Sequence, residues 1–304
     1  MLGYSTENIV LTSFYSLIIL VGVFSNVVII CVVFRKRQMQ TTTNILLASN
    51  ACADLLTLLW CIPFLSLKFF PHPTGLVGNI VCVLVTKQNV TSITLCVSML
   101  TLCLLAIERY NALLKPMKEN LRLSKGTVGY ALLCVWTLST IFGLPLFIKT
   151  YYEESTRRCK FHFETRLFWI VSGSCLLILI SITCFCYSRI IKGLYFTNAV
   201  CAAKPTIDKH REVCEKRKVL KLLLFITSAF VLCLTPRVLY FFFSPLMKHK
   251  KDISVFKRLS FLFLISNSTI NPVICLTQNT NYITCLQNMY RRIKLIRIWR
   301  KKPR

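Results

Sequence analysis

The stretch of sequence that decides the fold is residues 9–34, which read IVLTSFYSLIILVGVFSNVVIICVVF. It contains no charged residue, and a helix of this length, rising about 1.5 Å per residue, crosses the roughly 30 Å hydrocarbon core of a bilayer. It is too long for the apolar core of a secretory signal, and residues 1–8 carry no Lys or Arg. We therefore expect residues 1–8 to be an extracellular N-terminus that leads into a first membrane span.

Six further apolar blocks of similar length follow, near residues 44–69, 79–107, 126–148, 167–195, 218–243 and 257–278. In lipid, the backbone N–H and C=O groups must form hydrogen bonds within the protein, and the sequence lacks the alternation of a β-barrel, so helices are expected. The internal repeat that transporters often carry is also missing. Residues 9–278 are thus predicted to form an all-α, seven-transmembrane helix bundle. Residues 279–304 are predicted to form a short amphipathic membrane-surface helix and a basic cytoplasmic tail, with an apolar stripe at Tyr282, Ile283, Leu286, Tyr290 and Ile293.

Composition and charge support a membrane protein. The chain is 55% hydrophobic and only 16% charged, with a net charge of +27. Nucleic acid is not an expected partner, because that would need a basic face on a soluble fold; basic loops between apolar spans fit anionic membrane lipids instead. Most Lys and Arg fall between spans one and two, three and four, five and six, and in the tail, which predicts an extracellular N-terminus and a cytoplasmic C-terminus in the plasma membrane.

The cysteines agree with this orientation. Of the 16 cysteines, Cys82 and Cys159 are those at or beyond the extracellular ends of predicted spans. That compartment is oxidising, so we expect a disulfide that holds the loop after span four against the start of span three. The other cysteines are expected to be buried as small apolar side chains.

Short motifs then appear on the spans in a characteristic order, and with them the sequence resembles the rhodopsin-like (class A) G-protein-coupled receptors along nearly its whole length. They are Asn26, Leu47-Ala48, Asp54-Leu55, Glu108-Arg109-Tyr110, Pro116, Trp136, Pro145, Phe230, Cys233, Pro236 and Asn267-Ser268-Thr269-Ile270-Asn271-Pro272. The resemblance implies a receptor that passes an extracellular signal to a heterotrimeric G protein. It is closest to peptide receptors, through Cys61-Ile62-Pro63-Phe64 and the Asn267-Ser268 pair.

Two sets of polar residues, one around Asp54 and one at Glu108 and Arg109, are expected to change their contacts when such a receptor is activated. A carboxylate in mid-span is costly and normally functional, so we expect a polar cluster around Asp54 that includes Asn26, Ser98, Asn267 and Asn271. The resemblance implies that this cluster holds an exchangeable sodium ion; a static hydrogen-bonded cluster is the alternative. No other cofactor is expected.

At the cytoplasmic end of span three, the resemblance implies that Arg109, which stands between Glu108 and Tyr110, is held by Glu108 at rest. On activation it would be released to face the G protein and Tyr187. The alternative is an Arg that extends to the interface. Lys216 and Arg217 occupy the place of a second restraining acid, which predicts some basal activity. Pro236 and Pro272 are expected to kink spans six and seven and act as hinges.

The chain departs from the family pattern at four places. Leu234 replaces a tryptophan of span six, Leu179 a proline of span five, and Cys275 the tyrosine of span seven. Cys82 also lies two residues farther from Arg109 than the family pattern, which predicts a bulge or an altered start in span three.

The ligand is harder to infer. A retinal-binding protein is disfavoured because Ile265 stands where its lysine would be, and an amine receptor because the outer part of span three has no Asp. Arg237 lies deep in span six and needs a partner, so we expect an electropositive pocket for a carboxylate, phosphate or acidic peptide group, unless Arg237 points outward or pairs with the second extracellular loop. The predicted pocket residues are Lys87, Gln88, Thr91, Arg237, Phe241, Lys257 and Phe261.

Other functions find less support. An enzyme is not indicated, because the four histidines are scattered and no nucleophile motif occurs. The alternatives that stay open are a receptor that binds its ligand without G-protein coupling, given Leu234 and Cys275, a receptor for a small organic anion, and, remotely, a transporter.

Overall fold

The computed structural model describes the backbone of residues 6–67, 69–114, 123–161, 165–193, 207–243, 250–278, 282–285, 287 and 291. Side chains are described for the same residues except 6–9, 11, 165–170, 207–216, 241–243, 250–254 and 257. Most of the predicted surface helix and tail, residues 279–304, therefore lies outside the described part, and so does Pro116.

Within this part, seven helical segments are long and apolar enough to cross a membrane. The helices are α1 (Thr6–Arg35), α2 (Thr42–Ser66), α3 (Gly75–Val81) and α4 (Asn89–Leu114), α5 (Val128–Lys149), α6 (Thr165–Ile191), α7 (Ile207–Phe243) and α8 (Lys250–Gln278). Short 3-10 and π segments, η1 (Arg37–Met39) and η2 (Cys82–Thr86), and a hairpin of β1 (Thr150–Glu153) and β2 (Arg158–Phe161), complete the described elements. The predicted seven-helix bundle is confirmed.

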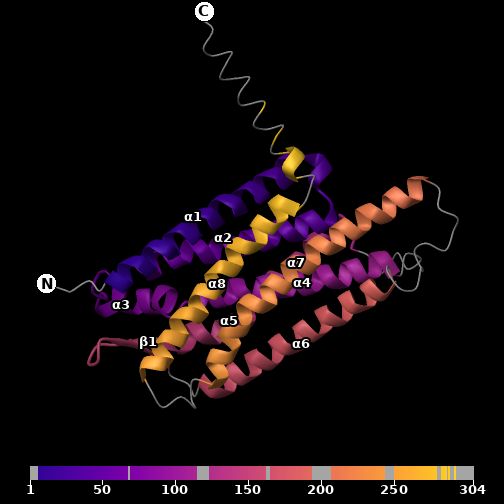
Figure 1. Ribbon diagram of the computed structural model, residues 1–304. Helices are drawn as coiled ribbons and strands as arrows, with labels where there is room; N and C mark the ends of the chain where they lie inside the picture. The colour runs from indigo at the N-terminus through magenta and orange to yellow at the C-terminus, as the bar shows by residue number, and fades with distance from the viewer. Residues whose placement is uncertain are drawn as a thin grey trace, which may run out of the picture.

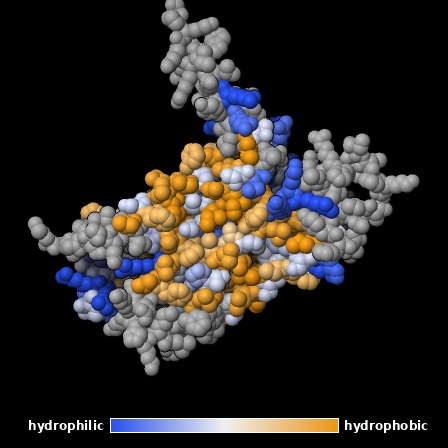
Figure 2. Space-filling model, in the orientation of Figure 1, coloured by the Kyte–Doolittle hydropathy of each residue, from blue (hydrophilic) through white to orange (hydrophobic). Residues whose placement is uncertain are grey.

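The helices form one elongated bundle. The start of α1, α3 and the hairpin lie at one end of it, and α8 ends at the opposite end (Figure 1). A belt of hydrophobic residues crosses the middle of the visible face, with hydrophilic residues at both ends (Figure 2). Large apolar side chains such as Phe24, Leu133 and Leu232 are exposed, as expected for a surface that faces lipid rather than water.

Two helices are longer than the apolar blocks predicted. α7 begins at Ile207 rather than near residue 218, and α8 begins at Lys250 rather than near residue 257. The added stretch of α7 reads IDKHREVCEKR and is strongly charged, so hydropathy excludes it from the membrane, although its Lys, Arg and Glu residues favour a helix in water. The helix that contains span six therefore has a charged extension before its apolar part.

Close packing of α1 against α2 and α8 depends on Gly22. A Cβ at this position would lie 2.3 Å from Thr269 Oγ1 and 2.5 Å from Leu58 Cδ1. The Thr269 hydroxyl in turn donates a hydrogen bond to the Ile18 carbonyl at 3.0 Å, which joins α8 to α1.

We expect Gly22→Val to destabilise the bundle by about 1–3 kcal/mol, because the added side chain separates three helices. The measurement is the apparent melting temperature of the purified protein in lipid nanodiscs. Gly129→Ala is the control, because a Cβ there meets nothing within 4 Å, and it should leave stability equal or slightly higher. Equal stability of both variants would show that α1 does not pack as described.

Candidate functional site: a cavity beneath a disulfide-anchored hairpin

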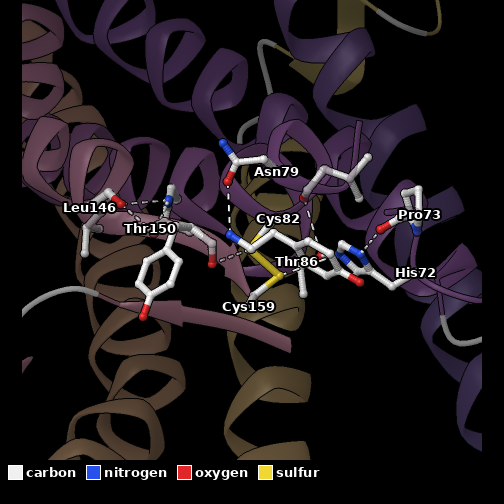
Figure 3. Close-up of a disulfide and its surroundings, with 12 residues drawn as sticks. His72, Pro73, Asn79, Cys82, Thr86, Leu146, Thr150 and Cys159 are labelled. Carbon is white, nitrogen blue, oxygen red and sulfur yellow. Dashed lines mark hydrogen bonds between the residues drawn. A yellow bond between two sulfur atoms is a disulfide. The ribbon is translucent and has the colours of Figure 1, made fainter. Parts of the chain in front are cut away.

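The β1–β2 hairpin is fastened to the start of the third span by the predicted disulfide. Cys82 of η2 is bonded to Cys159 of β2, with 5.7 Å between their Cα atoms (Figure 3). The Tyr152 N–H donates to Asn79 Oδ1 at 3.0 Å, and Lys160 Nζ lies 2.6 Å from Glu153 Oε2. Hydrogen bonds from Lys160 and Thr156 hold the pKa of Glu153 below its usual value. The disulfide prediction is confirmed.

The third span has the bulge that the displaced cysteine predicts. η2 is a π-helical segment, Cys82–Thr86, and Gln88, which follows it, has φ 57°. This left-handed conformation is unfavourable for a residue with a side chain, and such strain gathers at binding sites. Asn89 then begins α4, and its Nδ2 donates to the Leu146 carbonyl and to Thr150 Oγ1, each at 3.1 Å. Gln88 therefore lies directly after the bulge, at the mouth of the bundle.

A cavity of about 1050 Å³, its open mouth included, lies below this entrance between α4, α5, α6, α7 and α8. Apolar side chains line the cavity at every depth, with Leu146 and Val238 toward the hairpin end and Leu95, Met99 and Leu176 farther into the bundle. The polar or charged residues of the lining are Gln88, Thr91, Ser92, Ser172 and Arg237.

Three of the seven predicted pocket residues line this cavity, namely Gln88, Thr91 and Arg237. Two others lie elsewhere. Lys87 precedes the turn at Gln88, and its Nζ lies 4.3 Å from the centroid of the Phe161 ring. Phe261 packs between Tyr15 of α1 and Phe64 of α2, with ring centroids 5.7 and 5.1 Å away. The side chains of Phe241 and Lys257 lie outside the described residues.

The α5 and α6 walls of the cavity were not predicted. Phe142, Gly143 and Leu146 come from α5, and Ser172, Gly173 and Cys175 from α6. One signal in the sequence does point to the α6 wall: Leu179, one of the departures from the family pattern, lines the cavity, and so does a second departure, Leu234 of α7. A leucine in place of tryptophan at position 234 leaves space that a larger ring would occupy.

The polar cluster around Asp54 is assembled as predicted only in part. Asn50 Nδ2 donates to Asp54 Oδ2 at 2.8 Å, and Ser98 Oγ donates to Asp54 Oδ1 at 3.4 Å. The side chains of Ser268 and Asn271 also interact with this carboxylate. Asp54 is almost completely buried, 1% exposed, so its charge is neutralised or solvated within the bundle.

The described hydrogen bonds of Asn26 and Asn267 go to residues near Asp54 and not to Asp54 itself. Asn26 Nδ2 donates to the Gly22 and Ser268 carbonyls, each at 2.9 Å, so Asn26 joins α1 to α8 rather than binding Asp54. Asn267 Oδ1 accepts a hydrogen bond from Asn271 Nδ2 at 3.4 Å. Sequence spacing could identify the members of this cluster, but Asn50 was missed, because an asparagine one turn before Asp54 has no distinctive pattern.

At the other end of the third span, Arg109 is paired with the neighbouring Glu108 by two hydrogen bonds, through Nε and through Nη2, the latter at 2.8 Å from Glu108 Oε1. Glu108 is 5% exposed and Arg109 21%. Tyr187 is buried and its hydroxyl accepts a hydrogen bond from Thr227 Oγ1 at 3.3 Å, which joins α6 to α7, while Tyr110 packs against Phe185. Pro236 and Pro272 lie inside α7 and α8.

Comparison with known proteins agrees with this architecture. The family model described as seven-transmembrane receptor (rhodopsin family) matches residues 25–274. The chain belongs to this family. Its relatives include the [Phe13]-bombesin receptor of Bombina orientalis, 28% identical over 278 residues, which cover 85% of this chain and 70% of the relative. Bombesin receptor subtype-3 of Ovis aries is 28% identical over 277 residues, 85% of this chain and 69% of the relative.

Proposed function

We propose that this rhodopsin-family receptor binds a peptide in the cavity beneath the β1–β2 hairpin and responds by activating a heterotrimeric G protein. The cavity carries the proposal, because it opens beside a disulfide-anchored hairpin and is lined by five different helices, including α7, whose movement would open a cytoplasmic cleft. The names of the bombesin receptors among its relatives support a peptide rather than an amine.

The proposed orientation places the hairpin outside the cell and Arg109 inside, in the plasma membrane, with basic cytoplasmic segments against anionic lipids. Arg109 and Glu108 would be the cytoplasmic switch, and Pro236 and Pro272 the hinges. Because Lys216 and Arg217 stand where a second acid would restrain Arg109, some basal signalling is part of the proposal.

The direct test is a G-protein dissociation panel in cells that express the chain, challenged with peptide pools and with small organic anions. Dissociation of at least one G-protein class above the empty-vector level, with or without a peptide, is the expected result. A well-expressed surface receptor that gives no response to any pool would favour the alternative in which Leu234 and Cys275 leave a receptor that binds without coupling.

A sodium ion fits the Asp54 cluster. Besides the carboxylate, two buried amide oxygens near it, Asn50 Oδ1 and Asn271 Oδ1, have no hydrogen-bond partner among the described residues, and oxygen atoms of this kind suit a hard cation. Asp54, Asn50, Ser98 and Asn271 would hold the ion. Its charge would neutralise that of the buried carboxylate, and because one carboxylate supplies the only formal charge, the ion would be exchangeable.

We expect sodium chloride at roughly physiological ionic strength to stabilise the receptor by about 1 kcal/mol relative to N-methylglucamine chloride, and Asp54→Asn to remove this difference. The measurement is the apparent melting temperature in each salt. Asn26→Ala is the matched control: it removes the α1–α8 hydrogen bond to the Ser268 carbonyl and lowers stability, but it leaves Asp54 intact and should keep the sodium response. A response that survives Asp54→Asn would place sodium elsewhere.

A further inference from the structure

We propose that the cavity also opens sideways into the bilayer, between α5 and α6, and that one acyl chain of a membrane lipid enters it there. This binding goes beyond the proposed function, because it requires neither a peptide nor a G protein. Three observations support it: the spacing of the two helices, two residues that belong both to the cavity lining and to the outer surface, and the depth of these residues in their spans.

The two helices are spread apart on the surface of α4. Among the described residues, α5 and α6 each pack extensively against α4, whereas their contact with one another is slight. α5 comes close to α4 at Gly143, where a Cβ would lie 2.4 Å from Ile93 Cγ1. Phe142, Gly143 and Leu146 of α5 line the cavity on one side, and residues of α6 that include Cys175 line it on the other. The cavity therefore extends into the space between α5 and α6.

Two residues of the lining also reach the outer surface of the bundle. Phe142 is 37% exposed and Cys175 is exposed, and both line the cavity. Positions three and four residues after Cys175 lie on the same side of α6. The first of them, Ile178, is exposed, and the second, Leu179, lines the cavity. The wall of the cavity is therefore continuous with the outer surface at this edge of α6.

This opening lies at the depth of the lipid chains. Cys175 is four residues beyond Val171, where the apolar span of α6 begins, and Phe142 is seven residues before Lys149, where that of α5 ends. The two residues are thus about 6 and 10 Å from the hairpin ends of their spans, within the nearer half of a roughly 30 Å hydrocarbon core. Large apolar side chains on the outer faces beside the opening are exposed, as expected in lipid: Leu138, Ile141, Leu177 and Ile178.

An acyl chain suits this space better than water does. Apolar residues such as Leu95, Met99 and Leu176 line the cavity, and water needs several polar partners to stay in an enclosed site. An acyl chain gains no hydrophobic free energy by moving from the bilayer into the cavity, because both surroundings are apolar. It does give the lining side chains van der Waals contacts that they would otherwise lack. Its headgroup stays at the membrane interface, so the lipid needs no complementary charge inside the cavity.

Photolabelling from the bilayer tests the proposal directly. The full-length protein is placed in phosphatidylcholine nanodiscs that include phosphatidylcholine with a diazirine near the end of one acyl chain, and labelled residues are mapped after irradiation. Ile178, on the outer surface of α6, is the reference for contact with bulk lipid. We expect Met99 to be labelled as well. Met99 lines the cavity and is 7% exposed, so a chain that stayed outside the bundle would not reach it.

A bulky side chain at the opening should exclude the lipid chain. We expect Cys175→Trp to reduce labelling of Met99 about tenfold, by filling the gap between α5 and α6, while labelling of Ile178 is unchanged. Cys175→Leu makes a smaller change and should give a smaller reduction. Leu177→Trp is the matched control, because it adds the same ring on the outer face of α6, and it should leave labelling of Met99 as in the unmodified protein.

Three outcomes would overturn the proposal. The first is labelling of Ile178 without labelling of Met99 in the unmodified protein, a result that depends on no variant. The second is equal labelling of Met99 in the unmodified protein and in both variants of Cys175, which would place the entry elsewhere. The third is an equal loss in Cys175→Trp and Leu177→Trp. Since neither a peptide nor a G protein is present, these outcomes are separate from failure of the dissociation panel.

Discussion

Replacing Arg109 by alanine is expected to abolish G-protein activation while the receptor still reaches the cell surface. Arg109 lies near the end of α4 that is opposite the hairpin, half-buried, with its described hydrogen bonds directed to the adjacent Glu108. A charge held by a neighbour in its own helix contributes little to joining helices, so its removal should cost signalling rather than folding. The measurement is G-protein dissociation normalised to surface receptor, and we expect at least a tenfold loss.

The reverse change gives an independent check of the same pair. Glu108→Gln removes the charge that holds Arg109, so basal dissociation should rise about fivefold. Arg37→Ala is the control, because Arg37 is an exposed basic residue in η1 and has no described contact with Arg109. If Arg109→Ala and Arg37→Ala reduced signalling equally, Arg109 would act only as one of many basic surface residues.

The second large effect concerns the disulfide. Cys82→Ser is expected to reduce surface receptor severely and to destabilise the fold by about 4 kcal/mol, because the bond closes a long loop, with a sequence separation of 77. It also frees the hairpin that lies beside the cavity mouth. The amount of receptor at the surface and its apparent melting temperature measure the effect.

Two further variants make this result specific. Cys159→Ser should match Cys82→Ser, and the double variant should be no worse than either alone, because all three lack the same bond. Cys134→Ser, which changes an exposed free cysteine of α5, should behave as the unmodified receptor. Additive losses in the double variant would contradict the bond.

Sequence could predict the features that are determined directly by the lipid of the bilayer or by the oxidising conditions outside the cell. Residues 9–34 had to form a helix because lipid offers the backbone no other partners, and Cys82 and Cys159 were the pair placed where oxidation is possible. The two extra residues between Cys82 and Arg109 predicted a bulge or an altered start of span three, and a helix can absorb an insertion by widening one turn. The π segment Cys82–Thr86 is that turn.

Side-chain placement within the spans could not be predicted in the same way. Leu176 and Leu177 are adjacent leucines, yet Leu176 lines the cavity and Leu177 is exposed on the outer surface. In lipid both faces of a helix are apolar, so hydropathy carries no signal for the inward face. Lys87 was misplaced for a related reason: the direction of its side chain depends on the turn at Gln88, where φ is 57°, and the sequence pattern does not show this turn.

Seven membrane crossings put the two termini on opposite sides of the membrane, with the N-terminus on the side of the hairpin and the cavity mouth. Epitope tags at the two termini measure this directly in intact and permeabilised cells. We predict that the N-terminal tag is stained without permeabilisation and the C-terminal tag only after it. Staining of both tags on intact cells, or of neither, would contradict the seven-span bundle.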